Sequence, residues 1–437
     1  MTTTTDLGAT LDVTKPRHIG TIAFAGSIGT IVEWYDFIIY GTAAALVFNK
    51  LFFPNVDPRI GTLASLGSFA VGFLARPIGG AIFGHFGDRL GRKSMLMITM
   101  VAMGLATAAI GFLPTYAQIG IWAPSMLILL RVIQGIALGG EWGGASLMVL
   151  EHAPQHRRGL FGSLVQVGFP LGLVTASGVF SLVTTLPDAD FLAWGWRIPF
   201  LISIVLVAIG IFVRARLPET PVFEKIKSRG QIVRSPFVEM ILKSPRTFFI
   251  AVGLKLSEVS WVYMLTVFVV VYATTKLGLS KSLMLNAITL AALLELFTIP
   301  LFGHLSDIFG RRALYFAGVG FTVIFAFPLF WLLNTGTPEI VTIAVVIALN
   351  LGHGLMFAPE STYFPELFGA NVRYSGASLG FQVSAAIGGG FAPLIATALA
   401  AYMGGTGGVS IMLILLALVT LTATLFARET KDDALIT

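Results

Sequence analysis

Two acidic residues and one arginine lie inside long apolar stretches, and their types and spacing could perform chemistry. Glu33 and Asp36 are three positions apart, so on a helix they would share one face. Arg131 lies in a separate apolar stretch. An ionisable group inside a bilayer is costly, so it usually faces a partner or a cavity and often serves a proton or ion pathway. A carboxylate that changes its charge partner when a proton arrives would suit such a pathway.

Asp36 is the residue that we expect to carry a proton, and Arg131 is its expected partner. Counted from the outer ends of their stretches at 1.5 Å per residue, Asp36 lies about 18 Å deep and Arg131 about 10 Å deep, which is compatible with a pair once helices tilt. Glu33 is the rival carrier. A fixed salt bridge is the alternative for the pair, and Arg131 could instead bind a substrate carboxylate, because its planar guanidinium matches one.

Lys255 and Glu258 form a second pair of ionisable residues at a spacing of three, and Trp261 and Tyr263 follow in the same stretch. These four residues could form one wall of a substrate site, in which Lys255 and Arg131 hold an anion from two sides. The alternative is an ion pair within one helix, since buried charges also serve structure.

Arg76 and Glu141 lie about 22–25 Å from the outer ends of their stretches. We expect them to form a structural pair, although Arg76 could instead attract an anionic substrate. Uncharged polar residues that could line a substrate cavity are Tyr40, Gln134, Gln166 and Gln382. Glutamines also commonly link neighbouring membrane helices. Glu295 and His353 are further protonatable groups, but a lone histidine is more often a packing residue.

The composition indicates which elements hold these residues. Of 437 residues, 56% are hydrophobic and 11% are charged, whereas soluble domains carry roughly 25% charged residues. A soluble enzyme, a disordered chain and a disulfide-stapled secreted domain are therefore excluded. A helix needs about 20 apolar residues to cross a bilayer. Twelve such stretches occur, at 19–48, 61–83, 95–113, 124–150, 159–185, 195–215, 247–275, 282–303, 313–334, 339–364, 375–402 and 407–427. We expect an all-α membrane protein.

The basic residues indicate how these stretches are oriented. With the N-terminus inside the cell, 20 of the 28 Lys and Arg residues fall in inner segments and four fall in outer segments. Because cytoplasmic loops carry an excess of Lys and Arg, we expect both termini in the cytoplasm. The net charge of +6 then reflects topology, and we expect no nucleic-acid partner.

The longest polar segment divides the twelve stretches into six and six. It predicts the following domains: a cytoplasmic tail at 1–18 without the features of a secretory signal, a six-helix bundle at 19–215, a cytoplasmic linker at 216–246, a second bundle at 247–427 and a tail at 428–437. The two halves share a repeat, because GHFGDRLGRK from Gly84 aligns without a gap with GHLSDIFGRR from Gly303. Paired bundles of this kind indicate a transporter with its substrate site between them, near the midplane.

Motifs along nearly the whole chain resemble a known family. The doubled loop G-x-x-x-D-x-x-G-R-[KR] resembles the signature of the major facilitator superfamily. Strings similar to its metabolite:proton symporter family are EWYDFIIYGTAAALVF, FLARPIGGAIFGHFGDRLGRK, LLRVIQGIALGGEWGGA, EHAPQHRRG, GWRIPF and RLPETPVF. The resemblance implies two pseudo-symmetric six-helix bundles that import a small organic acid anion with protons by alternating access. The string LFGANVRYSGASLGFQVSAAIGGGFAP looks closest to the shikimate-transporter branch.

The resemblance also implies a gate at the cytoplasmic loops, where carboxylates and basic groups would lock the outward-open state. The gating residues we expect are Asp88, Arg89, Arg92, Lys93, Glu151, Arg157, Asp307, Arg311 and Arg312. The alternative is that Arg92 and Lys93 only set topology.

We expect a transporter and not an enzyme, because no G-x-x-x-x-G-K-[ST] motif is present and the histidines lack zinc-type spacing. We expect no cofactor and no metal. The expected partners are a small organic anion, protons and the lipid bilayer, for a monomer in a bacterial inner membrane. Shikimate-like monocarboxylates come first as substrates, then 2-oxoglutarate or citrate. The alternatives are an exchanger or facilitator without protons, a carrier of a zwitterion such as proline or betaine, and a membrane sensor, for which the polar linker is too short.

Overall fold

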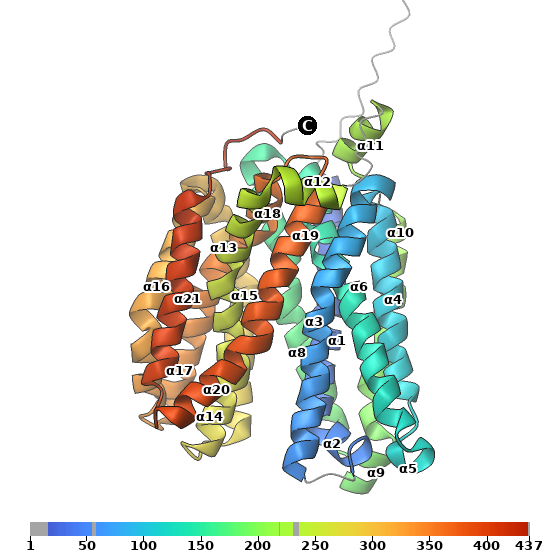
Figure 1. Cartoon of the computed structure of the whole chain (residues 1–437), viewed down its shortest axis with the longest axis vertical. Coiled ribbons are helices and arrows are strands. Elements are labelled where there is room, and N and C mark those ends of the chain that lie inside the picture. The colour runs from blue at the N-terminus through green and yellow to red at the C-terminus, as the bar shows by residue number, and fades with distance from the viewer. Residues whose placement is uncertain (1–15, 55–57, 218, 230–235, 436–437) are drawn as a thin grey trace, which may run out of the picture.

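The structure is a computed structural model of the whole chain, and it describes residues 16–54, 58–217, 219–229 and 236–435. Most of the expected tail at 1–18 and part of the expected linker at 216–246 lie outside the described residues. Helices joined by short turns make up nearly all of the described chain, and they form two bundles that stand side by side (Figure 1).

Six long helical segments build the N-terminal bundle. In chain order they are α1 (Pro16–Ala43) with η1 (Ala44–Phe48) and α2 (Asn49–Leu51), α3 (Pro58–Leu90), α4 (Arg92–Phe112), α6 (Trp122–His152), α7 (Arg158–Gln166) with α8 (Gly168–Val183), and α10 (Ile198–Ala215). Short helical turns connect them: α5 (Tyr116–Ile119), η2 (Gln155–Arg157), α9 (Asp188–Ala193) and η3 (Gly195–Arg197). Two short helices, α11 (Pro221–Ser228) and α12 (Pro236–Lys243), lie between the bundles in sequence.

The C-terminal bundle repeats this arrangement. Its segments are α13 (Pro245–Tyr263) with η4 (Met264–Phe268) and α14 (Val269–Thr275), α15 (Lys281–Phe309), α16 (Arg311–Leu333), α17 (Pro338–Ile347) with η5 (Ala348–His353) and α18 (Gly354–Leu367), α19 (Arg373–Ser384) with η6 (Ala385–Phe391) and α20 (Ala392–Tyr402), and α21 (Gly407–Phe426). The elements η1, η4, η5 and η6 are π-helical turns inside longer helices, and such turns are frequent at functional sites.

Within the described ranges, twelve long helices match the twelve apolar stretches of the sequence. Eleven helical segments of the described chain are long and apolar enough to cross a membrane, and α3 contains the expected stretch 61–83. The expectation of an all-α protein with two six-helix bundles is confirmed. Large apolar side chains that are more than half exposed cover the outer surface of the bundles, as a lipid environment requires; they include Phe24, Leu105, Phe249, Phe297, Ile324, Trp331 and Leu415.

Several helices extend beyond the apolar stretches that predicted them. α3 continues from the end of its stretch to Leu90, because backbone hydrogen bonding does not stop where the hydrocarbon does. Gly91 ends α3 and the equivalent Gly310 ends α15, with φ angles of 112° and 100°. Residues with a side chain rarely adopt such angles. The repeated glycine therefore turns the chain sharply between the second and third helices of each bundle.

The two bundles approach each other most closely at one end. This end carries the repeated loops at 84–93 and 303–312 together with α12 and the C-terminus, and we call it the basic end (Figure 1). There α3 packs on α19, and α15 packs on α7. The first glycine of each loop motif allows this approach, because a Cβ atom on Gly84 would lie 2.7 Å from Cα of Ser375, and one on Gly303 would lie 2.2 Å from Oγ of Ser163.

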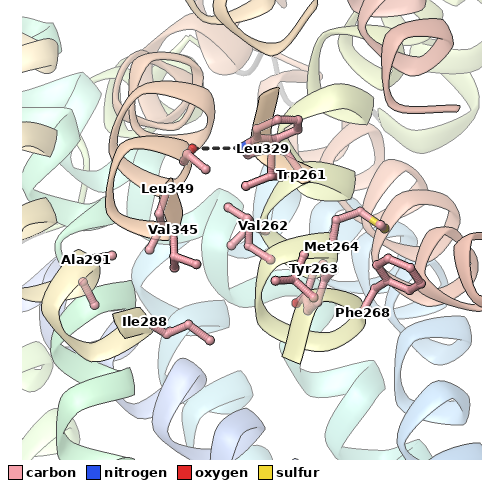
Figure 2. Packing of buried hydrophobic residues seen from close by; sticks show 14 of the residues in the cluster. Trp261, Val262, Tyr263, Met264, Phe268, Ile288, Ala291, Leu329, Val345 and Leu349 are labelled. Atoms are coloured by element: carbon pink, nitrogen blue, oxygen red, sulfur yellow. Dashed lines mark hydrogen bonds between the residues drawn. The ribbon is translucent and has the colours of Figure 1, made fainter. Parts of the chain in front are cut away.

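The largest hydrophobic core cluster lies in the C-terminal bundle and reaches across to the N-terminal bundle. Figure 2 shows its central part, where residues of α13, η4, α15 and α17 pack together. Phe37, Phe73 and Phe169 of the N-terminal bundle belong to the same cluster. The bundles therefore meet through buried aromatic side chains as well as at the basic end.

Candidate functional site

A chain of hydrogen bonds joins Asp36 on α1 to Arg131 on α6. Thr107 of α4 donates to Oδ2 of Asp36 at 2.7 Å, and Nε2 of Gln134 donates to the Thr107 hydroxyl at 2.5 Å. Nη1 of Arg131 in turn donates to Oε1 of Gln134 at 2.7 Å. All four side chains are buried, and we call them the N-terminal network.

The N-terminal network brings the expected carrier and its expected arginine together, but through neutral groups. Gln134, which the sequence suggested as a cavity residue, is one of these groups. Thr107 was missed by the sequence analysis, because a threonine within an apolar stretch gives no signal of its own. The link between carboxylate and guanidinium is thus made of hydrogen bonds that can rearrange separately.

Arg76 lies beside Glu33, and Glu141 lies elsewhere. Nη1 of Arg76 is 3.9 Å from Oε1 of Glu33. Glu141 instead forms an ion pair with Arg214 and accepts a hydrogen bond from Thr99 at 2.8 Å. The expected Arg76–Glu141 pair was therefore wrong.

Arg214 explains why Glu141 does not pair with Arg76. The sequence placed this residue among the basic residues around the linker, but it belongs to the last turn of α10 and is 2% exposed. Its guanidinium turns inward and also donates to the carbonyl of Leu96 at 3.1 Å. Because Arg214 holds Glu141, Arg76 faces α1 and the other bundle.

Aromatic rings surround the two arginines at the meeting of the bundles. The Arg76 guanidinium lies 4.9 Å from the ring centres of both Phe37 and Phe73. Arg131 lies 4.2 Å from the ring of Tyr40. Both phenylalanine rings pack edge-on against Tyr263 of α13, at 6.0 and 5.3 Å between centres. We call these two arginines and four rings the arginine–aromatic site.

Trp261 lies away from this site. Its indole N–H donates to the carbonyl of Ala348 at 2.7 Å, inside the core of the C-terminal bundle (Figure 2). Tyr263, two residues further on, points to the N-terminal bundle. The expected wall of a substrate site on this helix therefore contributes Tyr263 and not Trp261 in this conformation.

Five buried ionisable residues form the C-terminal network. Lys255 donates to Oε2 of Glu258 at 2.6 Å and lies 3.0 Å from Oε1 of Glu360. His353 lies 3.0 Å from Glu258 and 2.7 Å from Glu295. Each of the five residues is at most 2% exposed. Lys255 is thus held by two carboxylates of its own bundle, and a clamp between Lys255 and Arg131 is not formed in this conformation.

Gln166 and Gln382 link the two bundles at corresponding places. Gln166 of α7 donates to the carbonyl of Phe357 at 3.0 Å and accepts from the Trp142 indole at 2.9 Å. Gln382 of α19 donates to the carbonyl of Leu138 at 3.3 Å. Each glutamine therefore makes a backbone contact with the opposite bundle, as the helix-linking alternative predicts.

At the basic end, the aspartate of each repeated loop binds the first turn of a helix in the opposite bundle. Asp88 accepts from the backbone N–H groups of Tyr374 and Ser375 at 3.3 and 3.0 Å. Asp307 accepts from those of Gly159 and Leu160 at 2.7 and 2.9 Å. A carboxylate is favourable there, because the first N–H groups of a helix lack intrahelical partners.

Ion pairs around each aspartate extend this arrangement. Arg92 lies 3.6 Å from Glu151, and Glu151 lies 3.3 Å from Arg373 of the other bundle. In the second copy, Arg311 lies 2.8 Å from Asp307 and 3.4 Å from Glu366. Glu366 had not been predicted, although it precedes Arg373 by the same seven positions that separate Glu151 from Arg158.

The remaining expected gating residues lie at the edge of these contacts. Arg89 and Arg157 are exposed, and the buried neighbour of Arg157 is Arg158. Lys93 and Arg312 reach backbone carbonyl groups, of Ala215 at 2.8 Å and of Thr424 at 3.1 Å.

A second pair of equivalent glutamates was also missed. Glu219 accepts from the backbone N–H groups of Arg92 and Lys93, which begin α4. Glu429 accepts in the same way from those of Arg311 and Arg312, which begin α16. The signal was present in the sequence as a Glu-Thr dipeptide after the last helix of each half, at 219–220 and 429–430.

Comparison with known proteins identifies the family. The profile of the Major Facilitator Superfamily matches residues 26–389. The chain belongs to the major facilitator superfamily. Among its relatives is the shikimate transporter of Escherichia coli, which is 45% identical over 399 residues that cover 91% of this chain and 90% of the relative.

Other relatives agree with the resemblance to the metabolite:proton symporter family. The inner membrane metabolite transport protein YhjE of Escherichia coli is 41% identical and covers 99% of both chains. The proline/betaine transporter of Salmonella typhimurium is 36% identical, over 84% of this chain and 75% of the relative. A solved structure of the proton:xylose symporter XylE shares the fold with a TM-score of 0.76 at 18% identity, and the match covers 96% of this chain and 98% of that one. The chain is therefore a multi-pass membrane transporter.

Proposed function

We propose that this transporter imports a small organic anion of the shikimate-like monocarboxylate class together with protons across a bacterial inner membrane. The observation that carries the proposal is the arginine–aromatic site. Two buried arginines from α3 and α6 lie there beside Tyr263 of the opposite bundle, and paired-bundle transporters bind substrate between their bundles.

The chemistry of this site suits a carboxylate with a ring. A guanidinium can donate two parallel hydrogen bonds to a carboxylate. Rings such as Phe37 and Tyr263 provide apolar faces against which a cyclic carbon skeleton packs. Arg76 is placed to take part, because its ion-pair contact among the described residues is with Glu33 at 3.9 Å, longer than a hydrogen bond. The relative named as a shikimate transporter favours the same substrate class.

Asp36 is the proposed proton carrier. Its carboxylate reaches Arg131 through Thr107 and Gln134, so a substrate anion that draws on Arg131 alters the hydrogen bonding of Asp36. Protonation of Asp36 and binding of the anion would then favour each other, since each removes an uncompensated charge from a buried site. This reciprocity is what couples the two movements.

The basic end is the proposed cytoplasmic side, with both termini there. Asp88 and Asp307 close that end in this conformation, so the site would open to the outer side first. Release of their helix contacts would allow the bundles to rock and open inward. The proposed units remain a bundle at 19–215, a linker at 216–246 and a bundle at 247–427, working as a monomer.

Uptake by the purified protein in proteoliposomes tests the proposal. Radiolabelled shikimate, 2-oxoglutarate, citrate, proline and betaine are offered with and without an inside-alkaline pH gradient. We expect shikimate to accumulate when the gradient is present. Accumulation of proline or betaine in its place would contradict the anionic substrate, and equal shikimate movement with and without the gradient would show an exchanger or facilitator.

A further inference from the structure

The C-terminal network is not used by the proposed substrate site or by the proposed carrier Asp36. It joins three transmembrane helices, because Lys255 and Glu258 lie on α13, Glu295 lies on α15, and His353 and Glu360 follow each other on η5 and α18. His353 ends the π-helical turn η5. This turn places His353 between Glu258 on one side and Glu295 on the other.

The charges of the network do not balance unless protons are bound. Three carboxylates face one lysine, so an ionised network with a neutral histidine would carry a net charge of −2 in a buried site. Burial of uncompensated charge is strongly unfavourable, and such groups take up protons instead. Lys255 contacts both Glu258 and Glu360, and His353 contacts both Glu258 and Glu295. Glu295 has His353 as its ion-pair partner, and its Oε2 accepts no hydrogen bond from the described residues.

Other titratable groups close to the network do not supply the missing positive charge. The phenol of Tyr315 on α16 is buried and makes no hydrogen bond with the described residues, and it lies within electrostatic range of Glu360 and Glu258. Tyr263 on α13 lies within electrostatic range of Glu258. Glu33, across the interface on α1, lies within electrostatic range of Lys255 but adds a further acid.

We propose that His353 and Glu295 form a second proton-binding site, in the bundle opposite Asp36. A proton from water would bind to this pair, shared between a ring nitrogen of His353 and the Glu295 carboxylate, and would return to water on release. This inference rests on the proposed proton-coupled function and adds a proton to it. Proton binding by this pair would change during the transport cycle, because side chains of the opposite bundle cover the network.

Aromatic side chains of both bundles cover the network, with Phe169 and Trp142 contributed by the N-terminal bundle. The ring of Phe169 on α8 lies edge-on to the His353 ring, with 5.3 Å between centres, and the ring of Phe357 on α18 stacks on the His353 ring at 4.4 Å. At the other end of the network, Lys255 lies 3.8 Å from the ring of Phe381, which stacks on Trp142 of α6 at 3.9 Å. Movement of one bundle against the other must therefore uncover or cover the network, so that its contact with water changes with the transport state.

The number of protons moved with each substrate tests the site. In proteoliposomes whose membrane potential is clamped to zero, the substrate gradient at equilibrium balances the proton gradient. The slope of the logarithm of shikimate accumulation against the pH difference then equals the number of coupled protons. We expect His353→Gln and Glu295→Gln each to lower this slope by one proton, and Asp36→Asn combined with His353→Gln to lower it by two.

A matched control comes from the same two helices. Thr298 of α15 donates to Asn350 of η5 at 2.7 Å, and Thr298→Val removes this polar contact without removing a titratable group. We expect Thr298→Val to keep the wild-type slope. A wild-type slope of one, or an unchanged slope in His353→Gln, would overturn the second site. An unchanged slope in Asp36→Asn alone would overturn the carrier of the proposed function and leave the second site standing.

A measurement that needs no substrate covers the case in which shikimate is not transported or His353→Gln does not fold. In protein labelled with ¹⁵N-histidine, ring nitrogen shifts distinguish a doubly protonated ring from a neutral one, and the signals lost in His353→Asn identify His353. We expect a ring that carries both protons in the wild type and loses one in Glu295→Gln. A neutral His353 ring with the same shifts in both proteins would contradict the site.

Discussion

The two bundles hold their buried charges in different ways. In the N-terminal network, Asp36 and Arg131 are joined through two neutral side chains. In the C-terminal network, Lys255 contacts two carboxylates directly, at 2.6 and 3.0 Å. Direct contacts between buried charges hold both partners in place, because removal of either leaves the other uncompensated. A bridged pair can alter one hydrogen bond at a time, which suits a group that exchanges a proton.

Lys255→Met should give the largest effect, because it breaks the direct contacts of the C-terminal network. Removal of one partner of a buried ion pair typically costs about 3–5 kcal/mol of folding free energy. We expect a marked fall in the thermal unfolding temperature of the purified protein in detergent. Adding Glu360→Gln removes one of the two carboxylates left behind, so the double variant should recover part of the loss. A Lys255→Met protein as stable as the wild type would show that the network does not hold the bundle together.

Arg131→Ala should have the next largest effect, and on affinity more than on folding. A charge-assisted hydrogen bond contributes about 1.5–3 kcal/mol, or about ten- to a hundredfold in dissociation constant. Binding of shikimate and of its uncharged amide analogue is measured by calorimetry. We expect the carboxylate to lose affinity and the amide to be affected far less. Equal losses for both ligands would assign Arg131 to structure or coupling.

Arg76→Gln tests whether a second arginine of the N-terminal bundle binds the substrate anion. Arg76 contacts Glu33 at 3.9 Å and rests on two phenylalanine rings. If it binds the anion, its loss should weaken shikimate binding by a similar factor of about ten or more. Glu141→Gln is the control, because Glu141 contacts Arg214 and not the proposed site. A larger loss of affinity in Glu141→Gln than in Arg76→Gln would contradict the substrate role of Arg76.

Asp88→Asn compares the two copies of the basic end. Its carboxylate binds the first turn of α19, where a charge contributes up to about 2 kcal/mol. We expect slower transport, a near-normal folded fraction and greater labelling of site residues from the basic end. Asp307→Asn should act in the same direction on the contact with α7. Full transport with unchanged labelling in both variants would show that these contacts do not close the molecule.

Thr107→Val should have the smallest effect, because it removes one neutral hydrogen bond from the bridge between Asp36 and Arg131. Such a bond contributes about 0.5–1.5 kcal/mol. We expect substrate exchange to continue, whereas the pH dependence of uptake should shift, since Asp36 loses a donor to its charged form. Thr99→Val is the control, because Thr99 donates to Glu141 instead. An identical pH profile in wild type and Thr107→Val would argue against a bridge to the carrier.

The sequence predicted the fold because a helix that crosses a bilayer must be about 20 residues long and mostly apolar. Twelve apolar stretches, the basic loops and the repeat at Gly84 and Gly303 were sufficient for two six-helix bundles. The sequence also singled out Asp36, Arg131 and Gln134, since polar residues are conspicuous in apolar stretches. What it could not supply was the direction of each side chain around its helix.

The choice of partners shows this limit. Glu141 was expected to meet Arg76 on grounds of depth, but depth leaves several arginines possible, and Arg214 reaches inward from α10. Thr107 and Phe169 gave no signal, because their roles depend on which helix lies opposite. Glu366 and Glu429 were detectable in principle. Glu366 precedes Arg373 by the same number of positions as Glu151 precedes Arg158, and Glu429 precedes a threonine as Glu219 does.

The central claim is that Asp36 carries a proton with the substrate. Its most direct test is the slope of the logarithm of shikimate accumulation against the imposed pH difference in Asp36→Asn proteoliposomes, with exchange of internal for external shikimate measured in parallel. We predict that the slope falls by one proton while exchange continues, and that Asp36→Glu, which restores an ionisable group, retains the wild-type slope. A wild-type slope in Asp36→Asn would contradict the account and make Glu33 the leading candidate for the carrier in this bundle.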